Sequence, residues 1–379
     1  MHSEHLTPLT KVDGPYVSVF FDDSGDSAEA SGALQTRWRD IHRDLQDSGA
    51  PEATVAAVEE AVLHGKPAVG RWGHGVIAAG DRVLVDARMP SPPPTTTVRV
   101  SDYPYFLPLL DSWQPPYVFA AIDHLGADIT VHQDDRVHTE TIEGEGFPVH
   151  KPHNAGWYGL RDLEGSAEEA VRMNIRAVAD RLTALMDQSG AEVLFLAGEV
   201  QARAAALAAL PDRIAGRVSQ LPAGSTGRRA DEAEADESIV AELDRHRDAA
   251  VEDTDMRFRA EIGRGSGLAA EGLAAVCAAL RAGDVDTLIV GNLGDGTVLT
   301  GSERTVLAPD PDTLSELGQS ASAVVRVDEA LPFVALAVGA RVVHAADDIA
   351  LADGIGALLR YPAPEPTDRP GGAPVSATR

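Results

Sequence analysis

The fold is indicated most clearly by Ala278-Ala-Leu-Arg-Ala-Gly-Asp-Val-Asp-Thr-Leu-Ile-Val290. The residues before Gly283 continue an apolar helical pattern that begins near Leu268, and glycine is the residue that most often ends a helix. The run that follows, Val285–Val290, is short and mostly apolar, which is typical of a buried strand. A helix that leads directly into a buried strand predicts an α/β arrangement.

The same alternation predicts further elements on both sides, namely helices over 201–210 and 329–338 and strands over 193–197, 216–221, 341–344 and 356–361. A long helix precedes them. Ser166 and Glu169 form a capping box at its predicted start, and Gly190 marks its end. These elements extend the α/β pattern over the second half of the chain.

The first half of the chain predicts two groups of strands. The first group combines strands with two amphipathic helices: a strand over 16–21, helices over 28–46 and 51–63, a hairpin over 75–79 and 82–86, and a strand over 95–100. The second group is an antiparallel meander of strands over 117–123, 127–132 and 137–142. Both groups fit a mixed α/β protein.

Length and composition predict three domains. At about 100 to 200 residues per domain, 379 residues correspond to two or three domains. Pro115-Pro116 indicates a boundary near residue 114, and the Gly-, Ser-, Arg- and acid-rich stretch over 224–236 indicates a second linker. We therefore expect domains over 1–114, 115–230 and 231–361, followed by a disordered tail over 362–379.

The charge is strongly negative, with 32 Lys and Arg against 59 Asp and Glu and a formal net charge of -27. This total argues against a general polyanion binder, although a nucleic-acid site needs only a local basic surface. Eleven carboxylates lie between Asp231 and Asp255 and favour a linker and a solvated helix face. The single cysteine, Cys277, excludes internal disulfides and has the surroundings of a buried residue.

Neither a membrane span nor a signal peptide is predicted. The sequence has no run of 18 apolar residues, and Met1–His5 lacks a basic region followed by an apolar one. We expect a cytoplasmic protein without a membrane partner.

The segment Phe147–Arg161 is the best candidate site, because it contains no acidic residue in an acidic chain. It combines cationic and aromatic side chains with small ones that allow close approach: His150, Lys151, His153, Asn154, Gly156, Trp157, Tyr158 and Arg161. Cations contact phosphate, and each ring that stacks on an unpaired base contributes roughly 1 to 3 kcal/mol. The composition fits RNA binding, and the alternative is a surface loop whose Trp157 packs on its own domain.

Other motifs give weaker indications. The loop Gly263–Gly267 has the glycines of a phosphate loop, but no Gly-Lys-Ser/Thr follows, which favours an ordinary turn capped by Ser266. Five histidines lie within thirty residues without the spacing of a zinc site: His124, His132, His138, His150 and His153. Asp123 has no partner acid on a clearly adjacent strand. We expect no catalytic residue, metal or cofactor.

The order of these parts resembles that of bacterial relatives of the archaeo-eukaryotic class-one release factor and Pelota. Ala278–Val290 resembles a helix and strand of the release-factor C-terminal domain, and Asp353–Tyr361 resembles its closing strand. Within the group, the chain is most similar to the actinobacterial Balon-like ribosome hibernation factors. The resemblance implies an RNase H-like second domain and a third domain that is an α/β sandwich.

The loop over 147–161 falls where release factors carry a Gly-Gly-Gln motif. Gly156 matches one glycine, but no glutamine lies between Gln133 and Gln188, and no stop-codon reading motif is recognisable. The resemblance therefore implies a factor that occupies the A site of the 70S ribosome without hydrolysing peptidyl-tRNA.

In that arrangement the first domain faces the decoding centre and the loop faces the peptidyl transferase centre. The implied contacts are 16S and 23S rRNA, with elongation factor Tu as a partner and a monomer away from the ribosome. Two alternatives stay open: a rescue or release factor that hydrolyses peptidyl-tRNA without the glutamine, and a metal-dependent nuclease built on the meander.

Overall fold

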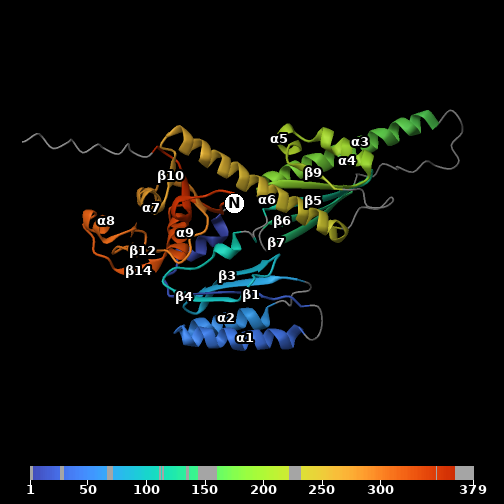
Figure 1. Ribbon diagram of the computed structural model, residues 1–379. Coiled ribbons are helices and arrows are strands. Elements are labelled where there is room, and N and C mark those ends of the chain that lie inside the picture. Colours follow the sequence, from blue (N-terminus) through green and yellow to red (C-terminus); the bar gives the residue numbers. More distant parts are fainter. Residues whose placement is uncertain are drawn as a thin grey trace, which may run out of the picture. The chain divides into compact units, whose positions relative to one another are not determined.

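The computed structural model describes residues 3–25, 30–65, 71–110, 112, 115–133, 136–143, 160–221, 232–346 and 348–362. These residues form a mixed α/β protein with several sheets, which confirms the predicted class (Figure 1). The chain folds as two compact units. Unit 1 combines Met1–Trp113 with Ala250–Arg379, and unit 2 is Gln114–Ala249. The three predicted domain boundaries stay a prediction.

The first sheet of unit 1 has the strand order β3-β2-β1-β4, and its neighbouring strands are antiparallel. Its strands are β1 (Tyr16–Asp22), β2 (Gly73–Ala79), β3 (Arg82–Met89) and β4 (Thr97–Ser101). Helices α1 (Ala30–Asp47) and α2 (Glu52–His64) cover one face, where Val17 and Phe21 pack against Trp38 (Figure 1). The predicted strands, helices and hairpin of this region are confirmed.

The opposite face of β1 belongs to a second core that the C-terminal part of the chain completes. Tyr16 and Phe20 are fully buried there together with Phe333. The 3-10 helices η1 (Ser3–Thr10) and η2 (Leu107–Leu109) add leucines to the same core. Because side chains alternate across a strand, β1 supplies apolar residues to both cores.

The second sheet of unit 1 is mixed and has the order β10-β16-β11-β15. Its strands are β10 (Ala269–Glu271), β11 (Val285–Val290), β15 (Arg341–His344) and β16 (Ile355–Leu359). Residues of α7 (Leu273–Ala282) and α9 (Val327–Ala337) lie in the large core with Leu288, whereas Phe258 of α6 (Glu232–Arg264) packs with Ile289 and Leu358. The predicted elements after Gly283 are confirmed, and Cys277 is buried as expected.

The predicted helix start near Leu268 is wrong, because residues 269–271 form β10 and pair with β16. Gly272, at a φ of 81°, separates β10 from α7. The sequence Leu268-Ala-Ala-Glu271 has a high helix propensity. Pairing with a strand more than eighty residues away overrides that local preference.

A small third sheet, with the order β13-β12-β14, completes unit 1 and was not predicted. Its elements are β12 (Thr297–Thr300), β13 (Leu307–Ala308), the short helix α8 (Pro311–Glu316) and β14 (Ala323–Arg326). Both pairings are antiparallel, and β14 leads directly into α9.

Unit 2 is built on one sheet with the order β7-β6-β5-β8-β9. Its elements are β5 (Tyr117–Ile122), β6 (Gly126–Gln133), β7 (Arg136–Glu143), α3 (Leu160–Ser189), β8 (Val193–Gly198), α4 (Val200–Ala209), α5 (Asp212–Ala215) and β9 (Val218–Gln220). Strands β5, β6 and β7 form an antiparallel meander, and β8 and β9 run parallel to β5. The predicted meander and strand-helix-strand alternation are confirmed.

Helices cover both faces of this sheet. Val178 and Leu182 of α3 pack in the core on one face, together with residues of α4. Ile239 and Leu243 of α6 pack on the other face against Phe195.

Two predicted boundaries are wrong. Helix α3 begins at Leu160, so Ser166 lies inside the helix and not at its N-cap. A capping box marks a favourable start, but the residues before it are compatible with a helix and extend it. The predicted linker over 224–236 overlaps α6, because residues 232–236 form the first turn of that helix, where Ala and Glu favour a helix. Residues 224–231 lie outside the described ones.

No helix in the described part of the chain is both long enough and apolar enough to cross a membrane.

An ion pair ties the edge strand β7 to α3. Arg181 donates to both carboxylate oxygens of Glu140, at 2.7 and 2.6 Å. These hydrogen bonds are the main cause that lowers the pKa of Glu140. Because the folded-state pKa is below that of an unfolded glutamate, about 4.3, the pair stabilises unit 2 above that pH. The contribution is lost as the pH falls through the folded-state pKa.

We expect Arg181→Met to lower the free energy of unfolding by about 1 kcal/mol at neutral pH, because the pair is bidentate but partly exposed. The difference from the parent should shrink below about pH 4. Urea unfolding at neutral and acidic pH measures both effects. Arg176→Met, at an exposed position of the same helix, is the control. An equal loss in both variants, or a loss that persists in acid, would contradict this role of the pair.

Candidate functional site

The predicted RNA-binding loop falls almost entirely outside the described residues. These are His150, Lys151, His153, Asn154, Gly156, Trp157 and Tyr158. Arg161 lies in the first turn of α3, but its side chain is not among the described ones. The structure therefore describes the two elements that flank the loop, β7 and α3, and the site itself stays a prediction.

The end of the sheet from which this loop departs is well defined. Glu143, the last residue of β7, pairs with Gly126 at the start of β6. Gly126 follows β5 by only a few residues, and Ile122 at the end of β5 pairs with Gly198 at the end of β8. Strand β7 therefore ends at the carboxyl ends of the parallel strands, the end of the sheet at which α/β proteins usually place their ligands.

Polar side chains from both strand ends meet at this edge. His124 Nδ1 lies 3.2 Å from Glu199 Oε2, and both side chains are about half exposed. Asn174 of α3 donates to the carbonyl oxygen of His124 at 3.5 Å. Gly198 has a φ of 98°, and a Cβ there would lie 2.3 Å from the carbonyl oxygen of Ile122. Only glycine therefore allows β8 to approach β5 this closely before Glu199.

Strand β8, which pairs with β5, holds no acid next to Asp123, but Glu199 comes directly after β8 and is the N-cap residue of α4. The position of Glu199, directly after a predicted buried strand, was the signal that could have found it. However, Asp123 Oδ1 accepts the backbone N–H groups of Leu125 and Gly126, at 2.8 and 2.9 Å. This carboxylate therefore stabilises the turn between β5 and β6.

The three described histidines of the predicted cluster contact different acids and do not converge. His132 stacks on Tyr117, with ring centroids 4.3 Å apart, and its Nε2 lies 2.7 Å from Glu232 Oε1. His138 lies 3.6 Å from Glu140, and His124 contacts Glu199. Across the ranges that the structure describes, no group of three or more His, Cys, Asp or Glu is placed to hold a metal ion.

Of the glycine-rich segment over 263–267, Gly263 and Arg264 end α6, and residues 265–267 lie in the turn that leads to β10. Ser266 Oγ accepts the N–H of Leu268 at 3.1 Å and donates to Glu261 at 2.6 Å. The loop leads into a strand and not into a helix, which corrects the assumption behind the phosphate-loop alternative. Without a helix N-terminus at this point, the main source of anion affinity in such loops is missing.

A second site lies in unit 1 and was not predicted. It is a groove of about 670 Å³ lined by residues of β4 and β14 and of their neighbours: Pro15, Arg99, Val100, Ser101, Asp102, Asp295, Ala323, Val324, Val325, Arg326 and Glu329. The two sides of the groove lie more than 190 residues apart in the sequence. A local sequence pattern could not have indicated it.

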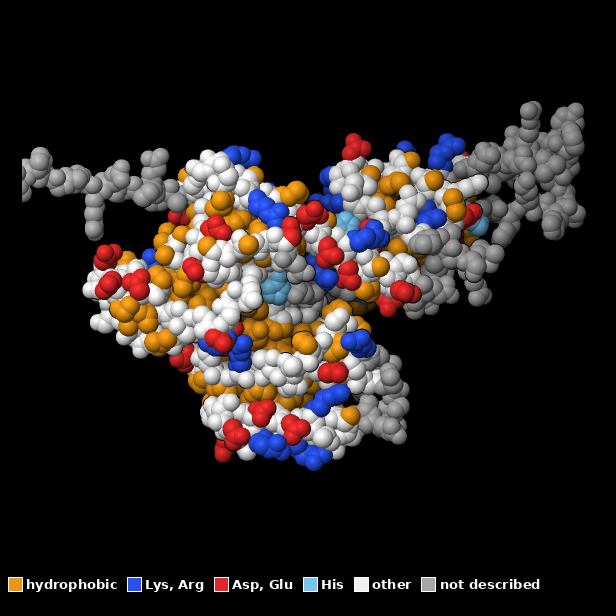
Figure 2. Space-filling model, in the orientation of Figure 1, with side chains coloured by type: hydrophobic (Ala, Val, Ile, Leu, Met, Phe, Trp, Pro, Cys, Tyr) orange, Lys and Arg blue, Asp and Glu red, His pale blue; other side chains and the backbone are white. Residues whose placement is uncertain are grey.

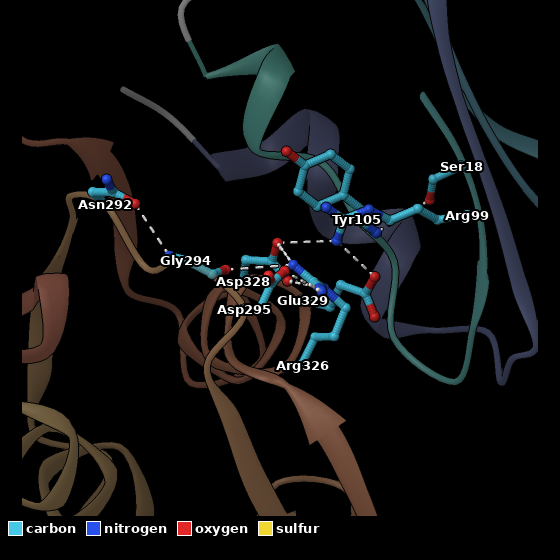
Figure 3. Close-up of polar contacts among 9 residues, drawn as sticks. All are labelled: Ser18, Arg99, Tyr105, Asn292, Gly294, Asp295, Arg326, Asp328 and Glu329. Carbon is cyan, nitrogen blue, oxygen red and sulfur yellow. Dashed lines mark hydrogen bonds and ion pairs between the residues drawn. The ribbon is translucent and has the colours of Figure 1, made fainter. Parts of the chain in front are cut away.

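Two arginines and three carboxylates form an ionic network in this groove (Figure 3). Arg99 Nη1 lies 3.0 Å from Asp328 Oδ2 and 2.9 Å from Glu329 Oε1. Arg326 donates to both oxygens of Asp328 at 2.9 Å and to Asp295 at 3.2 Å. The side chain of Glu329 is 2% exposed and that of Asp328 is 10% exposed. The negative charges of Asp328 and Glu329 are therefore withdrawn from water and neutralised by arginine, whereas the third carboxylate, that of Asp295, is exposed.

Neighbouring contacts hold the network in place. The guanidinium carbon of Arg99 lies 3.7 Å from the ring centroid of Tyr105, and the N–H of Tyr105 donates to Ser18 Oγ at 3.1 Å (Figure 3). On the other side, Asn292 Oδ1 accepts the N–H of Gly294 at 3.1 Å, next to Asp295 (Figure 3). Arg99 thus links the N-terminal sheet to the start of α9 in a fixed orientation.

We expect Arg99→Met to destabilise unit 1 by about 3 to 5 kcal/mol, because it leaves the buried Glu329 carboxylate without its cation. The double variant Arg99→Met/Glu329→Met should recover most of this loss, since it removes both buried charges. Chemical denaturation of the full chain measures both. The control is Arg39→Met, since Arg39 is exposed and its hydrogen bonds stay within α1. A double variant as unstable as Arg99→Met would contradict this explanation.

Comparison with known proteins identifies relatives over most of the chain. A family model described as "Bacterial archaeo-eukaryotic release factor family 2" matches residues 116–264. Two proteins of Mycobacterium tuberculosis are each 51% identical over 365 residues, which are 96% of this chain and 98% of each relative. They are described as Uncharacterized protein MT2704, from strain CDC 1551 / Oshkosh, and Uncharacterized protein Rv2629, from strain H37Rv.

Solved structures of archaeal factors are similar at low identity. The archaeal translation termination factor aRF1 is 16% identical, with 95% of this chain and 97% of that one covered and a TM-score of 0.24. Pelota of Archaeoglobus fulgidus is 15% identical, with 94% and 91% covered and a TM-score of 0.35. Pelota in a model of ribosome-bound archaeal Pelota and ABCE1 is 14% identical, with 95% and 94% covered and a TM-score of 0.41.

The relatives at 51% identity span nearly the whole chain, and the family model matches unit 2 and the rest of α6. The chain therefore belongs to the same family as these mycobacterial proteins, and over residues 116–264 it matches the bacterial archaeo-eukaryotic release factors of family 2.

Proposed function

We propose that this protein is a Balon-like hibernation factor that occupies the A site of idle ribosomes and blocks their decoding and peptidyl transferase centres. One observation supports this most strongly: a release-factor relative with a net charge of -27 keeps fifteen residues, 147–161, free of acid. That segment connects β7 to α3 at the carboxyl edge of the unit 2 sheet. An exposed edge of this kind suits a loop that enters an RNA-lined site.

The residue types in the loop match the chemistry of ribosomal RNA. His150, Lys151 and Arg161 would contact phosphate, whereas Trp157 and Tyr158 would stack on unpaired bases. Gly156 would let the backbone approach the RNA closely. His153 and Asn154 would add polar contacts to the same surface.

The missing glutamine favours blocking over catalysis. In the Gly-Gly-Gln motif of release factors the glutamine helps to place the hydrolytic water, and no glutamine lies between Gln133 and Gln188 here. We therefore propose that the loop occupies the peptidyl transferase centre without releasing a peptide. The alternative is a rescue or release factor that orders water with backbone groups.

The rest of the chain would act as the scaffold of this blocking function. In the proposal, the three domains predicted from the sequence span the A site, with the first domain at the decoding centre and contacts to 16S and 23S rRNA. Elongation factor Tu is the proposed partner, and the protein is a cytoplasmic monomer away from the ribosome.

The surface charge should restrict binding to this one kind of RNA site. On the face shown in Figure 2, acidic and basic side chains of the described residues are interspersed over the molecule. A surface of mixed charge with a large acidic excess repels phosphate overall. We therefore expect weak binding to random RNA and specific binding only where the loop fits.

We expect Trp157→Ala/Tyr158→Ala to weaken binding to 70S ribosomes at least about tenfold, because each lost stacking contact contributes roughly 1 to 3 kcal/mol. Co-sedimentation of the purified protein with vacant ribosomes measures this. Trp113→Ala, at a tryptophan outside the loop, is the control. Unchanged affinity in the double variant would show that the loop packs on its own domain, and a protein that never moves with ribosomes would refute the proposed function.

A peptide-release assay separates blocking from hydrolysis. With ribosomes that carry peptidyl-tRNA and an empty A site, the protein should bind but leave the peptidyl-tRNA intact, because the loop lacks the glutamine. A release factor that recognises the codon in the A site is the positive control. Release at a rate comparable to that control would establish the rescue-factor alternative.

A further inference from the structure

Two edge strands, one from each of two sheets, border the groove in unit 1. Strand β4 is the edge of the sheet β3-β2-β1-β4, and β14 is the edge of the sheet β13-β12-β14. An edge strand presents backbone N–H and C=O groups that are not paired within its own sheet. Val100 of β4 and Val324 of β14 both line the groove.

The pairing register identifies which backbone groups of β14 face away from its sheet. Val327 donates its N–H to the carbonyl oxygen of Gly296 at 3.0 Å, in register with the pairing of Arg326 and Thr297. Bonded and free residues alternate along an antiparallel strand, so Val325 and Ala323 also bond to β12. The N–H and C=O of Val324 therefore point away from β12.

The same argument applies to β4. Asp23 donates its N–H to Trp72 at 2.9 Å, in register with β1 and β2, so the odd-numbered residues of β1 bond to β2. The even-numbered residues bond to β4, where Ser18 pairs with Arg99. The backbone of Val100 therefore lies on the free edge of β4.

The charged side chains around the groove fall into two groups, one nearly buried and paired and the other exposed. The arginines are bound by the nearly buried Asp328 and Glu329, so this part is close to neutral. The exposed carboxylates are those of Asp102 and of Asp295, whose side chain is 97% exposed. A segment that enters the groove therefore meets carboxylates that can attract a cation.

We propose that this groove binds an extended basic segment of a partner protein, which adds to the edge of β14. The free N–H and C=O of Val324 would pair with the segment, and the exposed Val324 side chain, at 66%, would pack against an apolar residue of it. A lysine or arginine of the segment would lie between Asp102 and Asp295. The volume of about 670 Å³ is in the range of ligand sites, about 300 to 1,000 Å³. This inference does not depend on ribosome binding.

Two labelled peptides test the proposal with the full-length chain. The probes are Thr-Val-Arg-Val-Thr-Val and Thr-Val-Glu-Val-Thr-Val, each with fluorescein at its N-terminus, and fluorescence anisotropy gives their Kd values. The arginine peptide should bind at least about tenfold more tightly than the glutamate peptide. Failure of both peptides to bind, or equal affinities for the two, would overturn the proposal.

Substitutions at the edge of β14 test the backbone pairing. Val324→Pro removes an N–H that makes no bond to β12, so the sheet should keep its pairing and tolerate proline at its edge. It should weaken binding of the arginine peptide at least about tenfold, whereas Val324→Thr, which keeps the N–H and the β-branch, should stay within about twofold. Equal binding by both variants would overturn addition to β14.

Charge variants provide a readout that does not depend on proline. Asp102→Asn/Asp295→Asn should abolish the preference for the arginine peptide, and a preference that persists would exclude these carboxylates as the recognition element. Sedimentation of the free chain tests the other occupant: a dimer that Val324→Pro dissociates would show that a second copy fills the groove, against the proposal. Ribosome binding by Val324→Pro should equal that of the parent chain, which keeps this test apart from the proposed function.

Discussion

The burial of β1 on both faces is the constraint on which the rest of unit 1 depends. In Tyr16-Val-Ser-Val-Phe-Phe21 the alternation of the strand sends Val17, Val19 and Phe21 toward α1 and α2, and Tyr16 and Phe20 toward the core completed by the C-terminal part. Burying a large apolar side chain contributes about 1.5 to 3 kcal/mol. Exposing either face of β1 would therefore lower the free energy of unfolding of unit 1 by a large amount. Arg99 of β4 then fixes the orientation of the N-terminal sheet relative to α9, because its guanidinium binds Asp328 and Glu329 of that helix. Residues on both sides of unit 2 in the sequence thus form one compact unit.

Much of the fold could be predicted because its elements have strong local patterns. Val285–Val290 and Val193–Ala197 are apolar runs next to glycines, and such runs become buried strands. Elements that depend on distant partners could not be predicted. Ala269–Glu271 has helical propensity but pairs with β16, and the short strands of the β13-β12-β14 sheet have too few residues for a periodic pattern. Tertiary pairing decides their conformation, and single-sequence propensity does not contain it.

The two candidate sites also differ in how far the sequence alone could predict them. The loop over 147–161 is visible in the sequence because cations, aromatic rings and the lack of acid are adjacent along the chain. The sequence does not indicate the groove, because Arg99 and Glu329 are 230 residues apart and meet only after folding. Asp123 is an intermediate case. The sequence shows a polar residue at the end of a strand, but only the structure shows that its carboxylate binds the turn and that Glu199 follows the neighbouring strand.

The structure also changes what the charge of -27 implies. Many arginines of the described residues bind carboxylates of the same chain: Arg99, Arg181, Arg213, Arg259, Arg326 and Arg341. In these pairs the cation is used to hold elements together, and little of its charge is left for an external phosphate. The segment 147–161 contains no acid of its own with which its cations could form such pairs. The cations of the segment 147–161 therefore differ from these arginines in the sequence around them, and the proposed RNA contact rests on this difference and not on the total charge.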